Sequence, residues 1–152
     1  MYQYKMEHVC TYRATLESPV LVSSTEGDIR ANFYVTGGEV WGPKLKGKVL
    51  PIGGDWLTLR ADGVCALDVR AALESEEGAH IDVAYNGILD MGPDGHANFL
   101  KGEVPDVVQI RAAPRLRTAH PDYQWVNRVQ FINIGEGRLK EGVVQYDVYA
   151  LG

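Results

Sequence analysis

Ionisable and aromatic side chains suited to proton transfer recur along this chain between Arg30 and Asn127. Proton transfer next to a carbonyl group needs a carboxylate base, a hydrogen-bond donor for the oxygen that gains charge, and apolar walls that exclude water. The candidate catalytic residues, which carry ionisable groups, are Asp55, Asp68, Tyr85, Arg70 and Arg111. The candidate substrate-binding residues, which are aromatic or polar, are Trp56, Arg30, Tyr123, Trp125 and Asn127.

The sequence leaves the roles within this set open. Asp55 or Asp68 is the candidate base, and Tyr85 or Tyr123 is the candidate acid. Ionisable groups that point into a barrel need partners or a ligand to offset their desolvation, which favours a functional interpretation. A structural interpretation also stays open, in which Asp55 caps a turn and the Asp68 carboxylate pairs with Arg70 or Arg111.

Two arginines and two tryptophans complete the predicted site. Arg70 or Arg111 is the candidate partner of the developing oxyanion, and Trp56 and Trp125 are the candidate walls. The carboxylates also provide a way to separate two functions. A raised carboxylate pKa in a closed pocket favours an enzyme, whereas a carboxylate locked to Arg70 or Arg111 favours a binding protein.

Three motif-like patterns lack residues or spacings that their chemistry needs. Residues 42–48, GPKLKGK, match a P-loop as far as the lysine, but Val49 stands where the metal-binding Ser or Thr belongs. Residues 90–101 resemble a calcium loop, but a lysine replaces the closing bidentate Glu. His80 and Asp82 share a predicted strand face, yet no spacing connects them to the other histidines. The sequence therefore predicts neither a cofactor nor a metal.

Composition limits the number of domains and the kinds of partner. The 152 residues, 45% hydrophobic and 23% charged, fit a single domain over residues 1–152. A formal charge of −5 with scattered basic residues argues against nucleic acid and an anionic membrane surface, and favours a small-molecule ligand. No apolar run reaches the ~20 residues that span a bilayer, and the start lacks a signal-peptide pattern, so we expect a cytoplasmic protein. Cys10 and Cys65 are expected to be buried free thiols.

Short strands separated by turns dominate the chain. The stretch Gly37–Arg70 is too rich in Gly and Pro for a helix, yet its segments VLPI, DWLTLR and VCALDVR suit strands. Further strands are predicted over residues 7–15, 29–36, 80–87, 107–113, 127–135 and 142–151. Because no amphipathic helix is present, we predict an all-β fold, a single closed antiparallel β-barrel of about eight to ten strands, lipocalin-like, with at most one short helical turn before Trp125.

Alternation and turn residues add detail to this barrel. Residues 80–87 alternate so that Val83 and Tyr85 share one strand face, and the Asn-Gly pair at 86–87 predicts a hairpin turn. Residues 90–103 form a long polar segment that predicts a loop. Several strands carry polar side chains on both faces, which favours a barrel with a partly polar cavity over a sandwich.

The ordered motifs GGEVWGPKLKGKVLPIGGDW, RADGVCALDVR, DVAYNG and YQWVN resemble the small bacterial and fungal barrel proteins known as domain of unknown function 3237. The resemblance covers about Val20 to Leu151 and implies a lone closed antiparallel barrel, similar in shape to lipocalins and allene oxide cyclase, with a pocket at or inside it. It implies that the glycines and Pro43 set backbone geometry and that the polar and aromatic members line the pocket. Val126 departs from the family, which frequently has Leu there. The positions that match the family pattern are Gly38, Gly42, Pro43, Gly47, Asp55, Trp56, Asp62, Gly63, Asp68, Arg70, Gly78, Tyr85, Gly87, Tyr123, Trp125 and Asn127.

Two functions follow from these observations. The first is a cofactor-free isomerase, cyclase or lyase that uses Asp, Tyr and Arg for proton transfer on a small carbonyl-bearing compound, aromatic or polyketide-like. The alternative is a non-catalytic barrel of lipocalin type, in which the same residues orient a carboxylate or a phenol. The oligomeric state stays open: exposed strand edges and Trp41 are compatible with a homodimer, but no single residue requires one.

Overall fold

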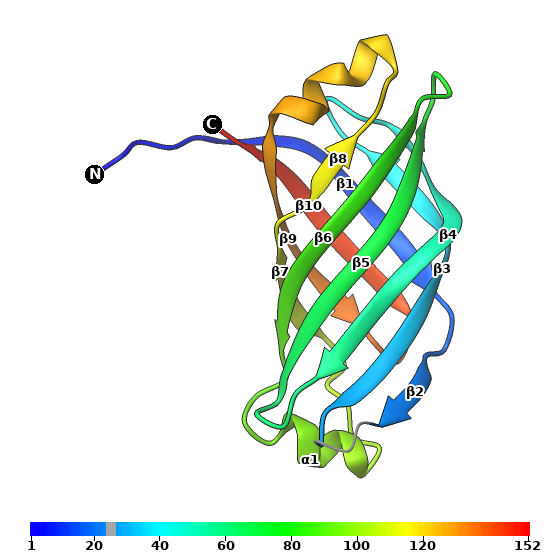
Figure 1. Cartoon of the computed structure of the whole chain (residues 1–152), viewed down its shortest axis with the longest axis vertical. Helices are drawn as coiled ribbons and strands as arrows, with labels where there is room; N and C mark the ends of the chain where they lie inside the picture. Colours follow the sequence, from blue (N-terminus) through cyan, green and yellow to red (C-terminus); the bar gives the residue numbers. More distant parts are fainter. Residues whose placement is uncertain (24–26) are drawn as a thin grey trace.

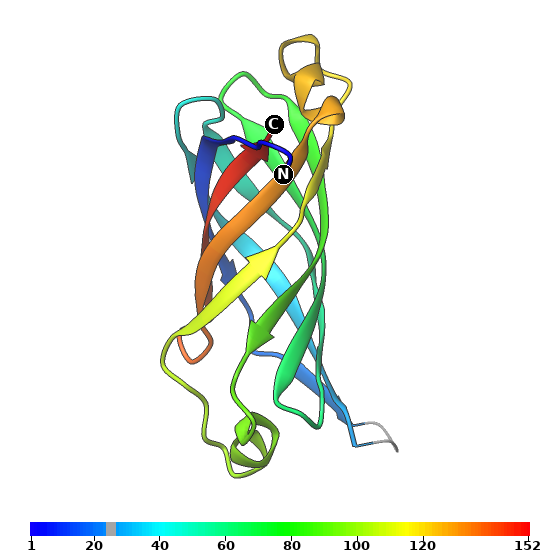
Figure 2. The same cartoon turned by 90° about the vertical axis from the view of Figure 1, so that its left-hand side faces the viewer.

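Eight strands form a closed antiparallel barrel in the computed structural model, which describes residues 1–23 and 27–152 (Figure 1). Their bounds are β1 (Met6–Leu16), β3 (Ile29–Trp41), β4 (Gly47–Leu59), β5 (Val64–Ser75), β6 (His80–Asp90), β7 (Val108–Ala112), β9 (Gln130–Arg138) and β10 (Val143–Leu151). The hydrogen-bonded order is β1-β10-β9-β7-β6-β5-β4-β3, and β1 also pairs with β3. That last pairing closes the wall, which Figure 2 shows from a second side. The predicted closed antiparallel barrel is therefore confirmed.

Two short strands extend the barrel wall. β2 (Val20–Ser23) pairs with β3 and continues the ladder that β1 begins on the same strand. β8 (Arg115–Arg117) pairs with β6 beyond the end of β7. With these additions the sheet has ten strands, which agrees with the predicted number.

Two short helical segments lie at opposite ends of the barrel (Figure 1). The 3-10 segment η1 (Pro121–Arg128) contains Trp125, where the sequence predicts a helical turn. The helix α1 (Gly95–Leu100) lies within residues 90–103, which the sequence predicts as a loop. His96 contacts the carbonyl oxygen of Gly27 at 2.7 Å and so holds α1 beside the start of β3. Among the described residues, no helix is long and apolar enough to cross a membrane.

The predicted hairpin turn at residues 86–87 is wrong, because β6 continues through this pair to Asp90. Gly87 pairs with Ala112 of β7, so it lies in the middle of the sheet. A Cβ atom at Gly87 would lie 2.7 Å from both the Cβ of Ala112 and the carbonyl oxygen of Arg111. Glycine is needed here for close strand approach rather than for a turn.

The glycine pair Gly53–Gly54 in β4 allows an irregularity in that strand before the segment that contains Asp55. The register between β4 and β5 shifts between Val49 and Gly53, and Gly53 has a φ of +88°. A Cβ atom on Gly53 would lie 2.1 Å from the carbonyl oxygen of Arg70. After this irregularity the strand alternates regularly, with Leu57 and Leu59 buried.

The end of the barrel that η1 covers is closed by packed apolar side chains. Val9, Ile81 and Phe131, each near the start of its strand, are 0% exposed. Val126 of η1 is also buried and belongs to the same hydrophobic core. Cys10 and Cys65 are both buried and unpaired, as the sequence predicts.

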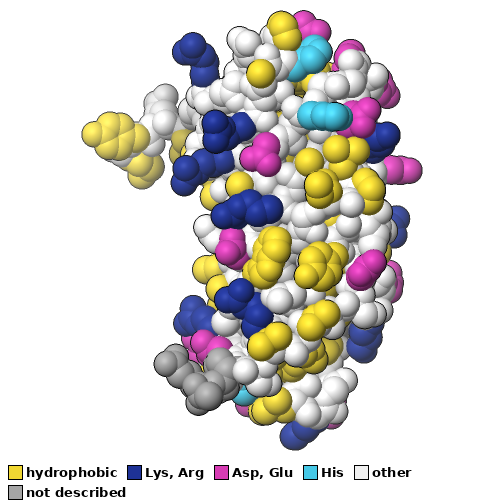
Figure 3. All heavy atoms as spheres, turned by 45° about the vertical axis from the view of Figure 1, so that its right-hand side comes forward, with side chains coloured by type: hydrophobic (Ala, Val, Ile, Leu, Met, Phe, Trp, Pro, Cys, Tyr) yellow, Lys and Arg dark blue, Asp and Glu magenta, His cyan; other side chains and the backbone are white. Residues whose placement is uncertain are grey.

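The outer wall carries apolar side chains between charged ones (Figure 3). Tyr34 of β3 and Ile52 of β4 are exposed, as is Trp41 at the end of β3. Among the described strands, β2 pairs with β3 alone, and no described strand pairs with its other edge. A homodimer through such exposed surface stays a prediction.

Candidate functional site

A row of side chains crosses four neighbouring strands and points into the barrel. The register pairs Phe33 with Asp55, Asp55 with Val69, and Val69 with Tyr85. Directly paired residues lie on the same face of a sheet, and Phe33, Val69 and Tyr85 are buried. Asp55 is also in phase with the buried Leu57 of its own strand. Asp55 therefore places a carboxylate on the inner face of the barrel, the same face that carries Tyr85 two strands away.

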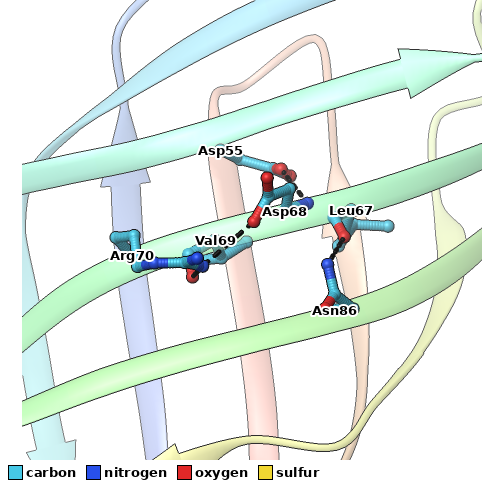
Figure 4. A network of polar contacts seen from close by, with 6 residues as sticks. All are labelled: Asp55, Leu67, Asp68, Val69, Arg70 and Asn86. Atoms are coloured by element: carbon cyan, nitrogen blue, oxygen red, sulfur yellow. Dashed lines mark hydrogen bonds and ion pairs between the residues drawn. The ribbon is translucent and has the colours of Figure 1, made fainter.

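The environment of Asp55 raises the pKa of its carboxyl group. Burial raises the pKa of this carboxyl to about 6, although the hydrogen bond from the backbone N–H of Asp68 lowers it. The negative charge of Asp68 raises the pKa further, and the positive charge of Arg30 lowers it. The Asp68 N–H donates to Oδ1 of Asp55 at 3.0 Å, as Figure 4 shows. A carboxyl with this pKa can take up and release a proton near neutral pH.

Three tyrosines gather beside Asp55 in the barrel interior. The hydroxyl of Tyr12 donates to the hydroxyl of Tyr85 at 3.2 Å. The ring of Tyr146 lies with its centroid 5.1 Å from that of Tyr12 and 5.9 Å from that of Tyr85. Burial raises the pKa of all three hydroxyls well above the ordinary tyrosine value. They therefore remain protonated and able to donate hydrogen bonds at neutral pH.

Asn133 orients the tyrosine pair. Its side chain is 0% exposed, and Nδ2 donates to the hydroxyl oxygen of Tyr12 at 3.0 Å. Tyr12 thus accepts a hydrogen bond from Asn133 and donates one to Tyr85. Such a chain polarises each successive donor. Tyr85 ends this chain, and its hydroxyl also interacts with that of Tyr146, since each of the two affects the pKa of the other.

A cavity of about 40 Å³ lies inside the barrel at this cluster. Asp55, Tyr12, Tyr85 and Tyr146 contribute its polar atoms. Its apolar lining is formed by Ala14, Leu16, Phe33, Val35, Val49, Leu57, Leu67, Val69, Ala71, Leu73, Val83, Leu89, Ile110, Leu139 and Val144. The site therefore combines a few hydrogen-bonding groups with water-excluding walls, as small-molecule pockets do.

Asp68 and Arg70 lie on the outer face of β5, away from the cavity. Leu67 and Val69 are the buried residues of this strand, so strand alternation turns Asp68 and Arg70 outward. Arg70 donates to the carboxylate of Asp68 at 3.0 Å, and both side chains are more than half exposed (Figure 4). Asn86 joins the same outer network through Leu67. This placement differs from the expectation that the Asp68 and Arg70 side chains point into the barrel.

Three further predicted residues also face outward. Arg111 is exposed on β7, where it donates to the carbonyl oxygen of Ile110 at 2.8 Å. Arg30 is exposed on β3, and Trp56 is half-buried on β4 at a position between the inward Asp55 and Leu57. None of the three belongs to the lining of the Asp55 cavity.

Two aromatic residues of η1 lie at the closed end of the barrel. The Tyr123 hydroxyl donates to Oε2 of Glu77 at 2.5 Å. The ring of Trp125 packs against Phe131 with a centroid distance of 6.1 Å, and the Lys44 ammonium lies 5.6 Å from the centre of the Trp125 ring. These contacts fasten η1 to the barrel and keep both aromatic residues apart from Asp55.

Asn127 fastens the connection between β8 and η1. Its Oδ1 accepts from the Thr118 backbone N–H at 3.0 Å, and its Nδ2 donates to the Thr118 carbonyl oxygen at 2.8 Å. Both functional atoms of this amide are therefore used by the backbone.

Within residues 1–23 and 27–152, no three His, Cys, Asp or Glu side chains converge as a metal site would require.

The structure thus brings together Asp55 and Tyr85 from the predicted set and adds Tyr12, Tyr146 and Asn133. The additional residues have one recognisable signal, which is a polar side chain in phase with inward apolar neighbours. Tyr146 lies between the cavity residue Val144 and the buried Val148, and Asn133 lies two residues after the buried Phe131. Similarly, Tyr12 precedes the buried Ala14 by two residues.

Comparison with known proteins identifies relatives over nearly the whole chain. A UPF0311 protein of Rhodopseudomonas palustris is 32% identical over 146 residues, which cover 94% of each chain. The crystal structure of a protein with unknown function from Clostridium acetobutylicum ATCC 824 matches with a TM-score of 0.88 and 27% identity, covering 99% of this chain and 100% of that one. The crystal structure of an enzyme from Penicillium herquei matches with a TM-score of 0.72 and 18% identity, covering 100% and 97% of the two chains. At that identity the last similarity establishes the fold alone.

A family model confirms the resemblance seen in the sequence motifs. The match extends from residue 4 to residue 151, so it also includes the first strand, which precedes the motifs. The barrel that the resemblance implies is the barrel observed here. This chain therefore belongs to the family described as "Protein of unknown function (DUF3237)".

Proposed function

We propose that this protein binds a small, mostly apolar carbonyl compound inside the barrel and catalyses proton transfer on it, as a cofactor-free isomerase, cyclase or lyase. The observation that carries this proposal is the carboxyl of Asp55, which is half-buried, lines an apolar cavity and has a pKa of about 6 because it is partly removed from water. Burying an ionisable group without an ion pair is costly, so such a group indicates a functional site.

Asp55 is the proposed base. Its carboxylate removes a proton from a carbon next to the carbonyl group, and the electron pair of that C–H bond moves to give an enolate. The same carboxyl, now protonated, returns the proton to a different atom of the intermediate and becomes a carboxylate again. Isomerisation, cyclisation and elimination all begin with this kind of step, and no electron acceptor is consumed.

Tyr85 is the proposed donor to the enolate oxygen. The chain from Asn133 through Tyr12 ends at the hydroxyl of Tyr85, which lines the cavity. Donors that are already oriented stabilise a developing oxyanion without reorganisation during the reaction. In this proposal Tyr85 takes the part that the sequence offered to Arg70 or Arg111, both of which lie on the outer wall.

Asp68 supports the assignment of Asp55 by contrast. The Asp68 carboxylate is paired with Arg70 on the exposed surface, as expected of a structural ion pair. Among the described residues, the Asp55 side chain forms no ion pair within 4.0 Å, and its one hydrogen bond comes from a backbone N–H. A raised carboxylate pKa is expected of an enzyme, and a carboxylate paired with an arginine is expected of a binding protein. Asp55 has the raised pKa, so it supports the catalytic function.

Hydrogen exchange in D₂O tests this proposal even when the product of the reaction is not identified. The protein is incubated at neutral pH with aryl ketones, cyclic enones and 1,3-diketones, and deuterium uptake next to the carbonyl is followed by mass spectrometry and NMR. We expect one compound class to exchange faster than in buffer, with the enhancement reduced at least ~100-fold in Asp55→Asn. Asp82→Asn, which removes an exposed carboxylate from the outer face of β6, is the control that keeps the activity.

The alternative, a non-catalytic binding barrel, has a distinct outcome in the same experiment. Compounds that raise the melting temperature but exchange no faster than in buffer would support ligand binding without chemistry. Exchange that persists in Asp55→Asn would remove Asp55 from the proposed mechanism.

A further inference from the structure

Two cavities lie next to each other inside the barrel. Beside the cavity that contains Asp55, a second cavity of about 40 Å³ lies toward the α1 end. The two share Phe33, Leu57 and Leu139 in their linings. We call these three residues the neck. The second cavity is otherwise lined by Pro19, Ile29, Ala31, Leu59, Cys65, Met91 and Phe99.

The second cavity lies close to the surface of the protein. Pro19, Met91 and Phe99 in its lining are only half-buried, as is Leu139 of the neck. The opposite end of the barrel, where η1 lies, is packed with fully buried side chains (Figure 1). A ligand therefore meets less packed protein when it approaches Asp55 from the α1 end.

The chemistry of the two compartments also differs. The compartment with Asp55 contains a carboxyl group and three tyrosine hydroxyls. The lining of the second cavity is hydrocarbon apart from the sulfur atoms of Cys65 and Met91, and burial raises the pKa of the Cys65 thiol to about 12, so this thiol stays neutral. One compartment suits a polar head group and the other suits a hydrocarbon tail.

We propose that the ligand is elongated and amphiphilic, that it enters head first at the α1 end, and that the neck separates its polar head at Asp55 from its tail beneath α1. This inference rests on the placement of the reacting group at Asp55 in the proposed function. When the head lies at Asp55, the tail runs past Leu139 into the second cavity. The side chain at position 139 therefore determines which tail lengths the protein can bind. Leu139 lies between β9 and β10, outside both strands, and is only half-buried.

The test is a homologous series of 4-alkylphenols, from phenol to 4-octylphenol, measured by titration calorimetry at pH 7. A phenol can donate to Asp55 and accept from Tyr85, while its alkyl chain extends along the barrel. We expect the Kd to fall about fourfold for each methylene buried, until the second cavity is filled and the Kd becomes constant. A Kd that does not change with tail length, or no binding by any member of the series, overturns the inference.

Substitutions at the neck test where the tail of the ligand lies. Leu139→Trp is expected to weaken binding of 4-hexylphenol at least tenfold and that of phenol less than twofold, because the larger side chain fills the neck. Leu139→Ala, which cannot block the neck, should speed association of 4-hexylphenol. Leu100→Trp adds the same side chain at an exposed position of α1 and is the control, with unchanged binding expected. Equal loss of phenol and 4-hexylphenol binding in Leu139→Trp would contradict the head-first orientation.

The two proposals fail separately. A protein that binds the longer phenols according to this pattern but exchanges no protons would contradict the catalytic function and keep the amphiphilic site. A protein that exchanges protons on short ketones but shows no dependence on tail length would keep the catalytic function and contradict the inference drawn from the neck.

Discussion

Oδ1 of Asp55 accepts a hydrogen bond from the backbone N–H of Asp68 at 3.0 Å, across the β4–β5 boundary. This contact fixes one carboxylate oxygen by a donor that cannot rotate. Among the described residues, the second oxygen, Oδ2, accepts no hydrogen bond. One oxygen therefore positions the group, and the other remains available for a ligand in the cavity.

Replacing Asp55 by Asn should stabilise the protein at alkaline pH. The pKa of Asp55 is raised from 3.8 to about 6 in the folded state, so the protonated carboxyl is favoured by folding. The stability that this adds is fully present below pH 3.8 and is lost as the pH rises through about 6. The Asn variant avoids the loss, so urea unfolding at pH 8 should show a gain of about 3 kcal/mol over the unsubstituted protein.

The gain should shrink to near zero at pH 4, where Asp55 is protonated in the folded protein. Asp82→Asn, at an exposed position, should show no such dependence on pH. An Asp55→Asn variant that is less stable than the parent protein at pH 8 would mean that the carboxylate serves the fold.

Two surface charges should move the pKa of Asp55 in opposite directions. Asp68→Asn keeps the backbone N–H that donates to Asp55 but removes a negative charge, so the pKa of Asp55 should fall. Arg30→Gln removes a positive charge, so the same pKa should rise. Carbon-13 NMR titration of the Asp55 carboxyl measures both variants, and shifts of the same sign would refute the electrostatic account.

Tyr85→Phe should reduce proton exchange without unfolding the protein. The substitution removes the hydroxyl that ends the chain from Asn133 and Tyr12, and loss of one oxyanion donor costs about 100-fold in rate. Tyr146→Phe removes a neighbouring hydroxyl that has no hydrogen bond with Asn133 or Tyr12, and it should have a smaller effect. Exchange rates that fall equally in the two variants would show that Tyr85 has no special role.

Gly53→Ala should be far more destabilising than Gly78→Ala. Both glycines have similar positive φ angles, +88° and +83°, but only Gly53 would place its new Cβ against backbone, 2.1 Å from the carbonyl oxygen of Arg70. Backbone strain alone costs roughly 1 kcal/mol, whereas the additional clash should cost more than ~3 kcal/mol. Urea unfolding of the two variants compares them, and equal losses would refute the role of Gly53 in close packing between β4 and β5.

The barrel could be predicted from the sequence because its cause is local. Short runs with alternating apolar residues and frequent turn glycines leave few alternatives to a closed antiparallel sheet. The hairpin predicted at residues 86–87 failed for a non-local reason. Gly87 is required by the approach of Ala112, which lies 25 positions later in the sequence, and the residue pair alone does not encode that contact.

The candidate site was predictable only where strand phase could be recognised. Asp55 is two residues before the buried Leu57, and Tyr85 alternates with the buried Val83, so the sequence contained both signals. Asp68 and Arg70 carry the same chemistry but lie one position out of phase with Val69, which turns them to solvent. The contribution of Tyr12 depends on β1 closing the barrel opposite β6, and no local pattern predicts that arrangement.

The measurement that tests the central claim most directly is the pH dependence of carbonyl-adjacent hydrogen exchange in D₂O, for the compound that exchanges fastest. Because the base acts as a carboxylate, the rate in the unsubstituted protein should rise with pH through about 6 and then become constant. Asp55→Asn should reduce the rate to that of buffer at every pH. A rate that is independent of pH across this range, or one that survives in Asp55→Asn, would contradict the assignment of Asp55 as the base.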